Sequence, residues 1–401
     1  MDTPILCSPS NAGIVSNATR FSGIMGNGSV SSGANPRVPI TEAGAFSKLV
    51  VRLGAALTGS SQTLVVTVMK NNVDTALTVT FNTGDQVKAD TTHSFDVAAG
   101  DDVQIKWVAS ATAGVANDVQ CALVFTGTTA SKSILSAGHA ATSAATFLAV
   151  GSTPLNATET NIIVVAPCDG VIDRIRARRT TAPGAGQSVT YTLRLGASGG
   201  AMSNTGLAST ISDTNTAGTE GTTSVSVAAG DFLSIGVTVS GTPASSAGNV
   251  GLSWTPTIEG EALLFAAANS GASSSANRFI FPNGQVAQAT ESDAYGIAPM
   301  AFTARKLYGR VTTAPASGKS WTTDLMIAGA AQSLTAAVAD ANTTFTPDTT
   351  NSVSVANQNL IDLRIRPAGT PTAYGALGTG MVAFTGVEGG GGGRLLLMGV
   401  G

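Results

Sequence analysis

The sequence predicts an all-β protein built from three tandem β-sandwich domains of the jelly-roll type, with an extended N-terminal arm and a C-terminal tail. Three observations support this fold class. The composition is rich in small residues, apolar and polar residues alternate in short segments, and one order of segments returns three times. The immunoglobulin-like sandwich is the alternative, but its Cys–Trp–Cys core signature is missing.

The composition sets the limits of size and class. A chain of 401 residues is too long for a single ordinary core, so several domains are expected. Charged residues make up 11% and aromatic residues 5%, while 43% of residues are apolar and the net charge is −3. These values do not fit a disordered chain. They also argue against a nucleic-acid-binding surface, which needs clustered Lys and Arg.

The clearest strand lies at 180–196, where turn formers precede strict alternation of apolar and polar residues. Similar segments return at 312–329 and, in a degraded form, at 59–71. The apolar side chains of these strands should be buried between two sheets. The predicted core residues are Val189, Tyr191, Leu193, Trp321, Leu325, Leu64, Val66 and Val68.

Other landmarks return in the same order after about 130 residues. A short apolar strand begins each copy, and Phe21, Phe147 and Phe279 should be equivalent. An aromatic residue closes each copy, which predicts the same for Phe125, Trp254 and Phe384. The first copy contains about eight short strand patterns and no amphipathic helix, as in a two-sheet sandwich. The period is too long for a solenoid unit, so each copy should own a core.

The repeat divides the chain into five parts. These are an arm at 1–18, sandwiches at 19–130, 131–260 and 261–388, and a Gly-rich spacer with an apolar tail at 389–401.

Both terminal parts are candidate assembly elements. The arm is rich in Pro, Ser and Asn and contains Ile5. The spacer 389–393 is all glycine, and an apolar plug follows it, made of Leu395, Leu396, Leu397 and Met398. An apolar plug exposed to water is a liability, so we expect the arm and the plug to bury side chains against a neighbouring domain or subunit.

A row of arginines forms a third candidate. Arg174, Arg176 and Arg178 alternate on one face of a predicted strand. One interpretation is a solvated row that blocks unwanted strand pairing at a sheet edge. The other is a subunit contact with acidic groups, for which the candidates are Asp213, Glu220 and Glu291.

The sequence offers little for catalysis. The two histidines, His93 and His139, do not recur in the other copies, and no nucleophile elbow, phosphate loop or dinucleotide fingerprint is present. The three cysteines are widely spaced and form neither a disulfide framework nor a metal-ligand pattern. No apolar run is long enough to span a membrane. We therefore expect a protein without enzymatic activity, cofactor, metal, nucleic-acid partner or membrane span.

Two segments carry a resemblance to a known family. TTAPGAGQSVTYTLRLG at 180–196 and TTAPASGKSWTTDLMIAG at 312–329, each with the strands that follow, resemble a β-sandwich repeat of tailed-bacteriophage structural proteins. The resemblance implies a virion component, such as a capsid decoration, head-fibre or tail-associated protein. It also implies assembly in the host cytoplasm, with other virion proteins and copies of the chain itself as partners, and it transfers no catalytic residue.

The alternative function is a receptor- or glycan-binding adhesin that would bind a host-surface glycan. Such a protein is expected to display aromatic and polar clusters at its loop tips. Here the expected loop tips contain Gly, Ala, Ser and Thr, for example at 184–186 and 316–318. This composition favours the structural role.

Overall fold

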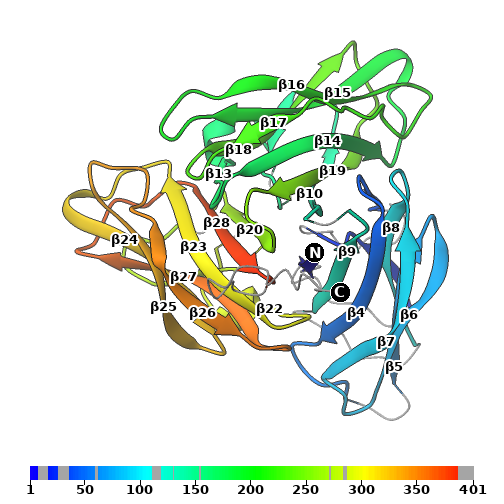
Figure 1. Ribbon diagram of the computed structural model, residues 1–401, viewed down its shortest axis with the longest axis horizontal. Coiled ribbons are helices and arrows are strands. Elements are labelled where there is room, and N and C mark those ends of the chain that lie inside the picture. The colour runs from blue at the N-terminus through cyan, green and yellow to red at the C-terminus, as the bar shows by residue number, and fades with distance from the viewer. Residues whose placement is uncertain are drawn as a thin grey trace, which may run out of the picture.

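The computed structural model describes residues 1–7, 17–25, 36–58, 62–110, 119–129, 131–152, 155–270, 272–282 and 287–386. Figure 1 shows three β-sandwiches arranged around a common centre. Within the described ranges the only helical elements are two 3₁₀ turns, η1 (Glu159–Asn161) and η2 (Glu291–Ala294). The all-β prediction is confirmed.

The first sandwich has two antiparallel sheets, with strand orders β1-β9-β4-β7 and β2-β8-β5-β6, and β3 also pairs with β8. Its strands are β1 (Asp2–Cys7), β2 (Thr19–Ser22), β3 (Val38–Pro39), β4 (Gly44–Arg52), β5 (Thr63–Lys70), β6 (Val73–Asn82), β7 (Val87–Val97), β8 (Asp102–Ala109) and β9 (Gln120–Gly127). If β2 and β3 count as one interrupted strand, the two sheets have the orders 1-8-3-6 and 2-7-4-5. This is the connectivity of a jelly roll.

The second sandwich repeats this connectivity, with β12 as an added strand. Its strands are β10 (Ser133–Thr142), β11 (Thr146–Leu148), β12 (Leu155–Asn156), β13 (Val164–Val165), β14 (Gly170–Arg179), β15 (Gly184–Gly196), β16 (Ser203–Asp213), β17 (Val225–Val227), β18 (Phe232–Ser240) and β19 (Ser246–Pro256). The strand predicted at 180–196 is β15, which lies between β18 and β16.

The third sandwich follows the same plan, with sheets β20-β28-β23-β26 and β21-β27-β24-β25, and β22 beside β27. Its strands are β20 (Glu261–Ala268), β21 (Arg278–Ile280), β22 (Gly296–Ile297), β23 (Phe302–Val311), β24 (Ala316–Ile327), β25 (Ala330–Asp340), β26 (Asp348–Val355), β27 (Leu360–Ala368) and β28 (Leu377–Phe384).

The predicted cores form as expected, because alternation along each strand sends one set of side chains between the sheets. All eight predicted core residues are buried, and none exposes more than 1% of its surface. The first landmark is also confirmed by the strand register. Phe21, Phe147 and Phe279 pair with Lys106, Gly236 and Arg364, which occupy the same position of β8, β18 and β27.

The closing aromatic residues lie in equivalent strands but not all at the same position. Phe125 pairs with Phe46, and Trp254 pairs with Ile172. In the third sandwich the matching residue is Ala383, and Phe384 is one position further along. Because neighbouring residues of a strand face opposite sides, Phe384 leaves its own core and packs with the core cluster of the second sandwich. The predicted equivalence of Phe384 is therefore wrong.

The N-terminal residues also differ from the expectation of a separate arm at 1–18. Asp2–Cys7 is β1, the edge strand of the first sandwich, and it matches β10 and β20. Ile5 packs in the core of its own sandwich, whereas Leu6 joins the core cluster of the third. Both faces of β1 are covered, so its apolar residues run on without the alternation that reveals a strand. The spacer and plug at 389–401 lie outside the described residues.

The three sheets that contain the first and last strand of each sandwich face the centre of the ring (Figure 1). A short strand of each sandwich crosses the inward sheet of the next one: β3 contacts β19, β13 contacts β28 and β22 contacts β9. The contacts close a ring, since the order runs from the first sandwich to the second, to the third and back to the first. One chain thus forms a pseudo-threefold trimer of domains.

Small residues make this close crossing possible. The register places Ala122, Gly251 and Gly380 at one equivalent position, below the crossing strands. A Cβ atom at Gly251 would overlap the carbonyl oxygen of Pro39, and one at Gly380 would overlap that of Val165. The side chain is missing because a backbone oxygen occupies its space.

We therefore predict that Gly251→Ala weakens the junction of the first and second sandwiches. The new methyl group must displace β3, and overpacking of this kind costs about 1–3 kcal/mol. Urea denaturation of the full chain measures the loss. Gly23→Ala is the matched control, because a Cβ atom there meets its nearest neighbour at 3.4 Å. Equal stability of both variants would contradict the tight crossing.

Candidate functional site

The three junctions between sandwiches form the candidate site, because the predicted arginine row lies at one of them. Each inward sheet carries an arginine at the same strand position, since Arg52, Arg178 and Arg310 lie two residues beyond the small-residue crossing. Each of these arginines reaches the sandwich whose short strand crosses its own sheet. Of the three, only Arg178 belongs to the predicted arginine row, although all three end a strand segment rich in basic residues.

The partners of these arginines differ from one junction to the next. Arg178 lies 3.0 Å from an Asp102 oxygen. Arg310 donates to the carbonyl of Thr160 at 3.0 Å and sits 5.0 Å from the ring centre of Phe232. The Arg52 guanidinium is 5.8 Å from the Tyr295 ring centre. The same position therefore supports an ion pair at one junction and cation–π contacts at the others.

The predicted arginine row forms part of the first junction. Arg174 lies 3.6 Å from Glu42 of the first sandwich, and Arg176 donates to both oxygens of Glu220 at 3.2 and 3.0 Å. Glu220 was one of the three acidic candidates, while Asp213 accepts from the backbone of a turn and Glu291 lies in the third sandwich. The row joins two domains of one chain, and any contact with another subunit stays a prediction.

Burial makes this charged junction different from a surface salt bridge. Lys132 links Glu42 at 3.0 Å with Asp173 at 2.7 Å. Burial raises the pKa of Asp102, and the neighbouring Arg178 and Arg37 offset only part of that effect. Desolvation therefore cancels much of the attraction between the charges, so the pairs specify how the two sandwiches meet more than they stabilise the contact.

The other two junctions are mainly apolar. Leu6, Val50 and Ala122 of the first sandwich belong to the core cluster of the third. Five residues of the third sandwich belong to the cluster of the second, namely Leu263, Phe265, Ala267, Val382 and Phe384. These junctions extend the domain cores across the boundary, which favours a rigid ring over independent domains.

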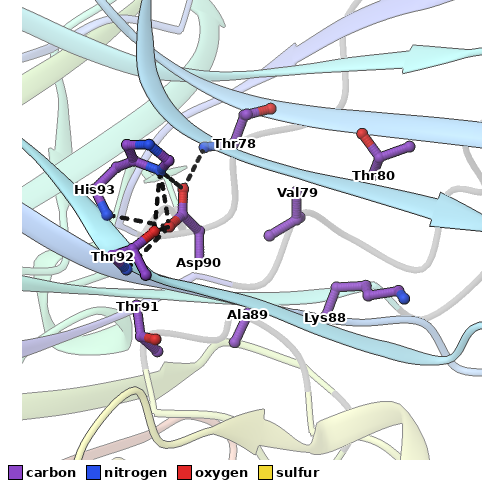
Figure 2. A pocket seen from close by; sticks show the side chains of 9 residues that line it. All are labelled: Thr78, Val79, Thr80, Lys88, Ala89, Asp90, Thr91, Thr92 and His93. Carbon is purple, nitrogen blue, oxygen red and sulfur yellow. Dashed lines mark hydrogen bonds and ion pairs between the residues drawn. The ribbon is translucent and has the colours of Figure 1, made fainter.

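A shallow depression on the first sandwich lies between β6 and β7 and contains His93 (Figure 2). Asp90 organises it. Its carboxylate accepts hydrogen bonds from the backbone of Thr78, Thr92 and His93, and its Oδ2 lies 2.9 Å from His93 Nδ1. Burial raises the pKa of Asp90, but hydrogen bonds from His93 and the three backbone groups outweigh burial and lower it to about 2.

The third sandwich repeats this carboxylate clamp without a histidine. Asp348 accepts from the backbone of Thr335, Thr350 and Asn351, and its pKa is also lowered to about 2 because these bonds outweigh burial. The segments Asp-Thr-Thr-His at residue 90 and Asp-Thr-Thr-Asn at residue 348 carried this signal. In the second sandwich Gly221 lies opposite Ile175, the place that matches Asp90 opposite Leu49 and Asp348 opposite Leu307, so this copy has no carboxylate there. The recurrence indicates that Asp90 fixes the bulge of an edge strand, a structural task.

The second histidine and the three cysteines are enclosed. His139 is buried, lies 2.9 Å from the Tyr191 hydroxyl through Nε2, and has its pKa lowered to about 4, first by burial. Cys7, Cys121 and Cys168 are buried free thiols, and Cys7 lies opposite Cys121 in the strand register. Across the described ranges, no three His, Cys, Asp or Glu side chains gather closely enough to hold a metal ion.

The clamp aspartates predict an acid-sensitive stability. Each folded pKa lies below the unfolded value of about 3.9, so the stabilisation is present above pH 4 and is lost as the pH falls towards 2. Asp90→Asn and Asp348→Asn should lower the free energy of unfolding at pH 7 by about 1–3 kcal/mol and flatten its fall between pH 4 and 2. Urea titrations at several pH values measure both effects. An unchanged pH profile in the double variant would contradict the clamp.

The helical turns of the described chain include none that is long and apolar enough to cross a membrane. No protein-family model matches the sequence, and no curated protein matches it significantly.

Proposed function

We propose that this chain is a non-enzymatic structural protein that occupies a threefold or local threefold position of a larger symmetric particle. A surface component of a bacteriophage virion, such as a capsid decoration protein, is the assignment that suits both this geometry and the sequence resemblance. The observation that carries the proposal is the closed ring of three jelly rolls within one chain.

The ring suits such a position because symmetry dictates the shape of a binding surface. A threefold axis presents the same lattice surface three times, and a ring of three similar domains can contact all three copies at once. Three weak contacts made together bind far more tightly than one, without any new contact. The ring here is rigid, since its junctions continue the domain cores, and rigidity lowers the entropy cost of binding at three points.

The chemistry of the described residues supports a role without catalysis. The exposed histidine, His93, neighbours a carboxylate whose bonds hold a strand bulge. The other histidine is buried and bonded to a tyrosine. These groups serve the fold, so the surface that remains for function is the outside of the ring.

Glycan binding is the second candidate, and the depression in Figure 2 is the observation that favours it. Its lining includes four threonines, Lys88 and His93, which can donate hydrogen bonds to sugar hydroxyls. The lining residues offer no Phe, Tyr or Trp on which a sugar ring could stack. A glycan array probed with the full chain and with the His93→Ala variant tests this candidate.

The structural proposal predicts that this chain is present in purified virus particles at a fixed ratio to the major shell protein. It also predicts density for a three-lobed ring on threefold or local threefold positions of the particle map. Quantitative mass spectrometry and electron cryomicroscopy of the particles provide the two measurements. A chain absent from purified particles, or one placed on a twofold or fivefold position, would contradict the proposal.

The predicted plug provides a sharper variant. Deletion of 389–401 should leave the three sandwiches folded but reduce the particle-bound fraction at least about tenfold, because burying apolar side chains contributes about 1.5–3 kcal/mol each. The matched control replaces Leu395, Leu396, Leu397 and Met398 by Ser and keeps the chain length. Both variants should lose binding to the same degree. Full binding by either would show that the plug has no part in assembly.

A further inference from the structure

The third sandwich contains a buried carboxylate that no described group neutralises. Along β27 the residues Ile361, Leu363 and Ile365 belong to the core cluster, so Asp362 points to the opposite side of the sheet. The turn η2 packs against β27. Asp362 has no exposed surface, and neither of its oxygens has a hydrogen-bond partner within the described ranges.

A second carboxylate faces the same place. Glu291 is the first residue of η2, and its Oε1 is buried without a hydrogen-bond partner among the described residues. A Cβ atom built on Gly329 would lie 3.9 Å from that oxygen and 4.0 Å from the Tyr295 hydroxyl, so Glu291 and Tyr295 converge beside Gly329. Burial, followed by the charge of Glu291, raises the pKa of Asp362 to about 8. Because η2 packs against β27, the charge of Glu291 acts on Asp362 across this contact.

In the second sandwich, an arginine of the chain itself neutralises the carboxylate at the equivalent place. Glu159 begins η1 there, as Glu291 begins η2. Arg194 donates to both oxygens of Glu159 at 2.6 and 3.0 Å, and the Ser234 hydroxyl donates at 2.6 Å. The positive charge of the arginine thus compensates the buried carboxylate.

The strand register makes the comparison exact at the residue level. Arg194 pairs with Ser234 in the second sandwich, and Met326 pairs with Asp362 in the third. The third sandwich therefore has Met326 at the position of the arginine and Asp362 at the position of the serine. The first sandwich has Gln104 at this place, whose amide donates to Asn72 at 3.2 Å.

The nearby arginines are directed to other groups. Arg364 donates through Nε and Nη2 to Asp324 at 3.1 and 2.9 Å. Arg52 donates to Gln120 at 2.8 Å and lies against the ring of Tyr295. A buried negative charge without compensation is strongly unfavourable, so an external positive charge would stabilise this spot.

We propose that the third sandwich binds a divalent cation of the calcium class between Asp362 and Glu291, where the second sandwich places the guanidinium of Arg194. Carboxylate oxygens are the ligands that calcium prefers, and its flexible coordination allows water to complete the shell around two protein carboxylates. Because η2 precedes Tyr295, which contacts Arg52, the cation would also support the junction of the third and first sandwiches.

The test uses the full chain after treatment with EDTA. Isothermal titration with CaCl₂ should show one site, and Asp362→Asn and Glu291→Gln should each weaken binding at least tenfold. At a calcium concentration roughly ten times the Kd, the melting temperature should rise by about 1–3 °C. Glu259→Gln is the matched control, because that carboxylate is exposed in the same part of the chain and should leave binding unchanged. MgCl₂ in place of CaCl₂ should bind more weakly, since magnesium demands a stricter geometry.

A second variant tests the comparison with the second sandwich. Met326→Arg should supply the missing guanidinium, raise the melting temperature without calcium and abolish the calcium response. The opposing outcome is neutralisation by a proton. In that case calcium would change nothing, and stability would fall as the pH rises from about 4 through 8, because the folded pKa of Asp362 lies above its unfolded value. That result, or calcium binding that survives Asp362→Asn, would overturn the proposal.

Discussion

The architecture depends on the close approach of backbone to backbone where one sandwich crosses the next. The carbonyl groups of Pro39 and Val165 lie where a side chain on Gly251 or Gly380 would otherwise stand. Because of this approach, water is excluded from between a sheet and the sandwich next to it. Leu6 and Phe384 can therefore pack into the core of a neighbouring domain. At this crossing distance, the side chains of Arg52, Arg178 and Arg310 are long enough to contact the neighbouring sandwich.

A sequence predicts best those strands that have one face buried in the core and the other face in contact with solvent. Tyr191 and Leu325 alternate with polar residues, because one side of their strand meets the core and the other meets solvent. The repeat was visible for the same reason. By contrast, β1 and β28 are covered on both faces, so neither alternation nor spacing distinguishes the core side from the junction side. That is why the first sandwich was predicted to begin too late and why Phe384 was assigned to the wrong face.

The partners of charged residues were less predictable still. The arginine row was recognised as a contact surface, and Glu220 was among the acidic candidates, but the sequence contains no signal for Glu42 or Asp102. These residues come from a different domain, and their approach is set by the ring rather than by local pattern. The clamp of Asp90 was visible in retrospect, since its Asp-Thr-Thr segment recurs in the third sandwich. A polar segment that recurs at the same strand position indicates a structural role common to the copies. Gln104, Ser234 and Asp362 occupy one equivalent position but differ in chemistry, which indicates that the three copies have diverged there.

The hydrogen bond between the Thr385 hydroxyl and the carbonyl of Asp2, at 2.6 Å, brings residues from opposite ends of the described chain side by side. Because these residues are close, the ring could be encoded with any of the three jelly rolls first in the polypeptide. A short linker from residue 386 to residue 2, with a new opening at 129–131 between the first and second sandwiches, would produce a permuted chain that starts with the second sandwich and closes the same ring. By the same geometry, three separate chains of one sandwich each would assemble into this ring, and each member would then be exchangeable on its own. The single chain prevents that exchange.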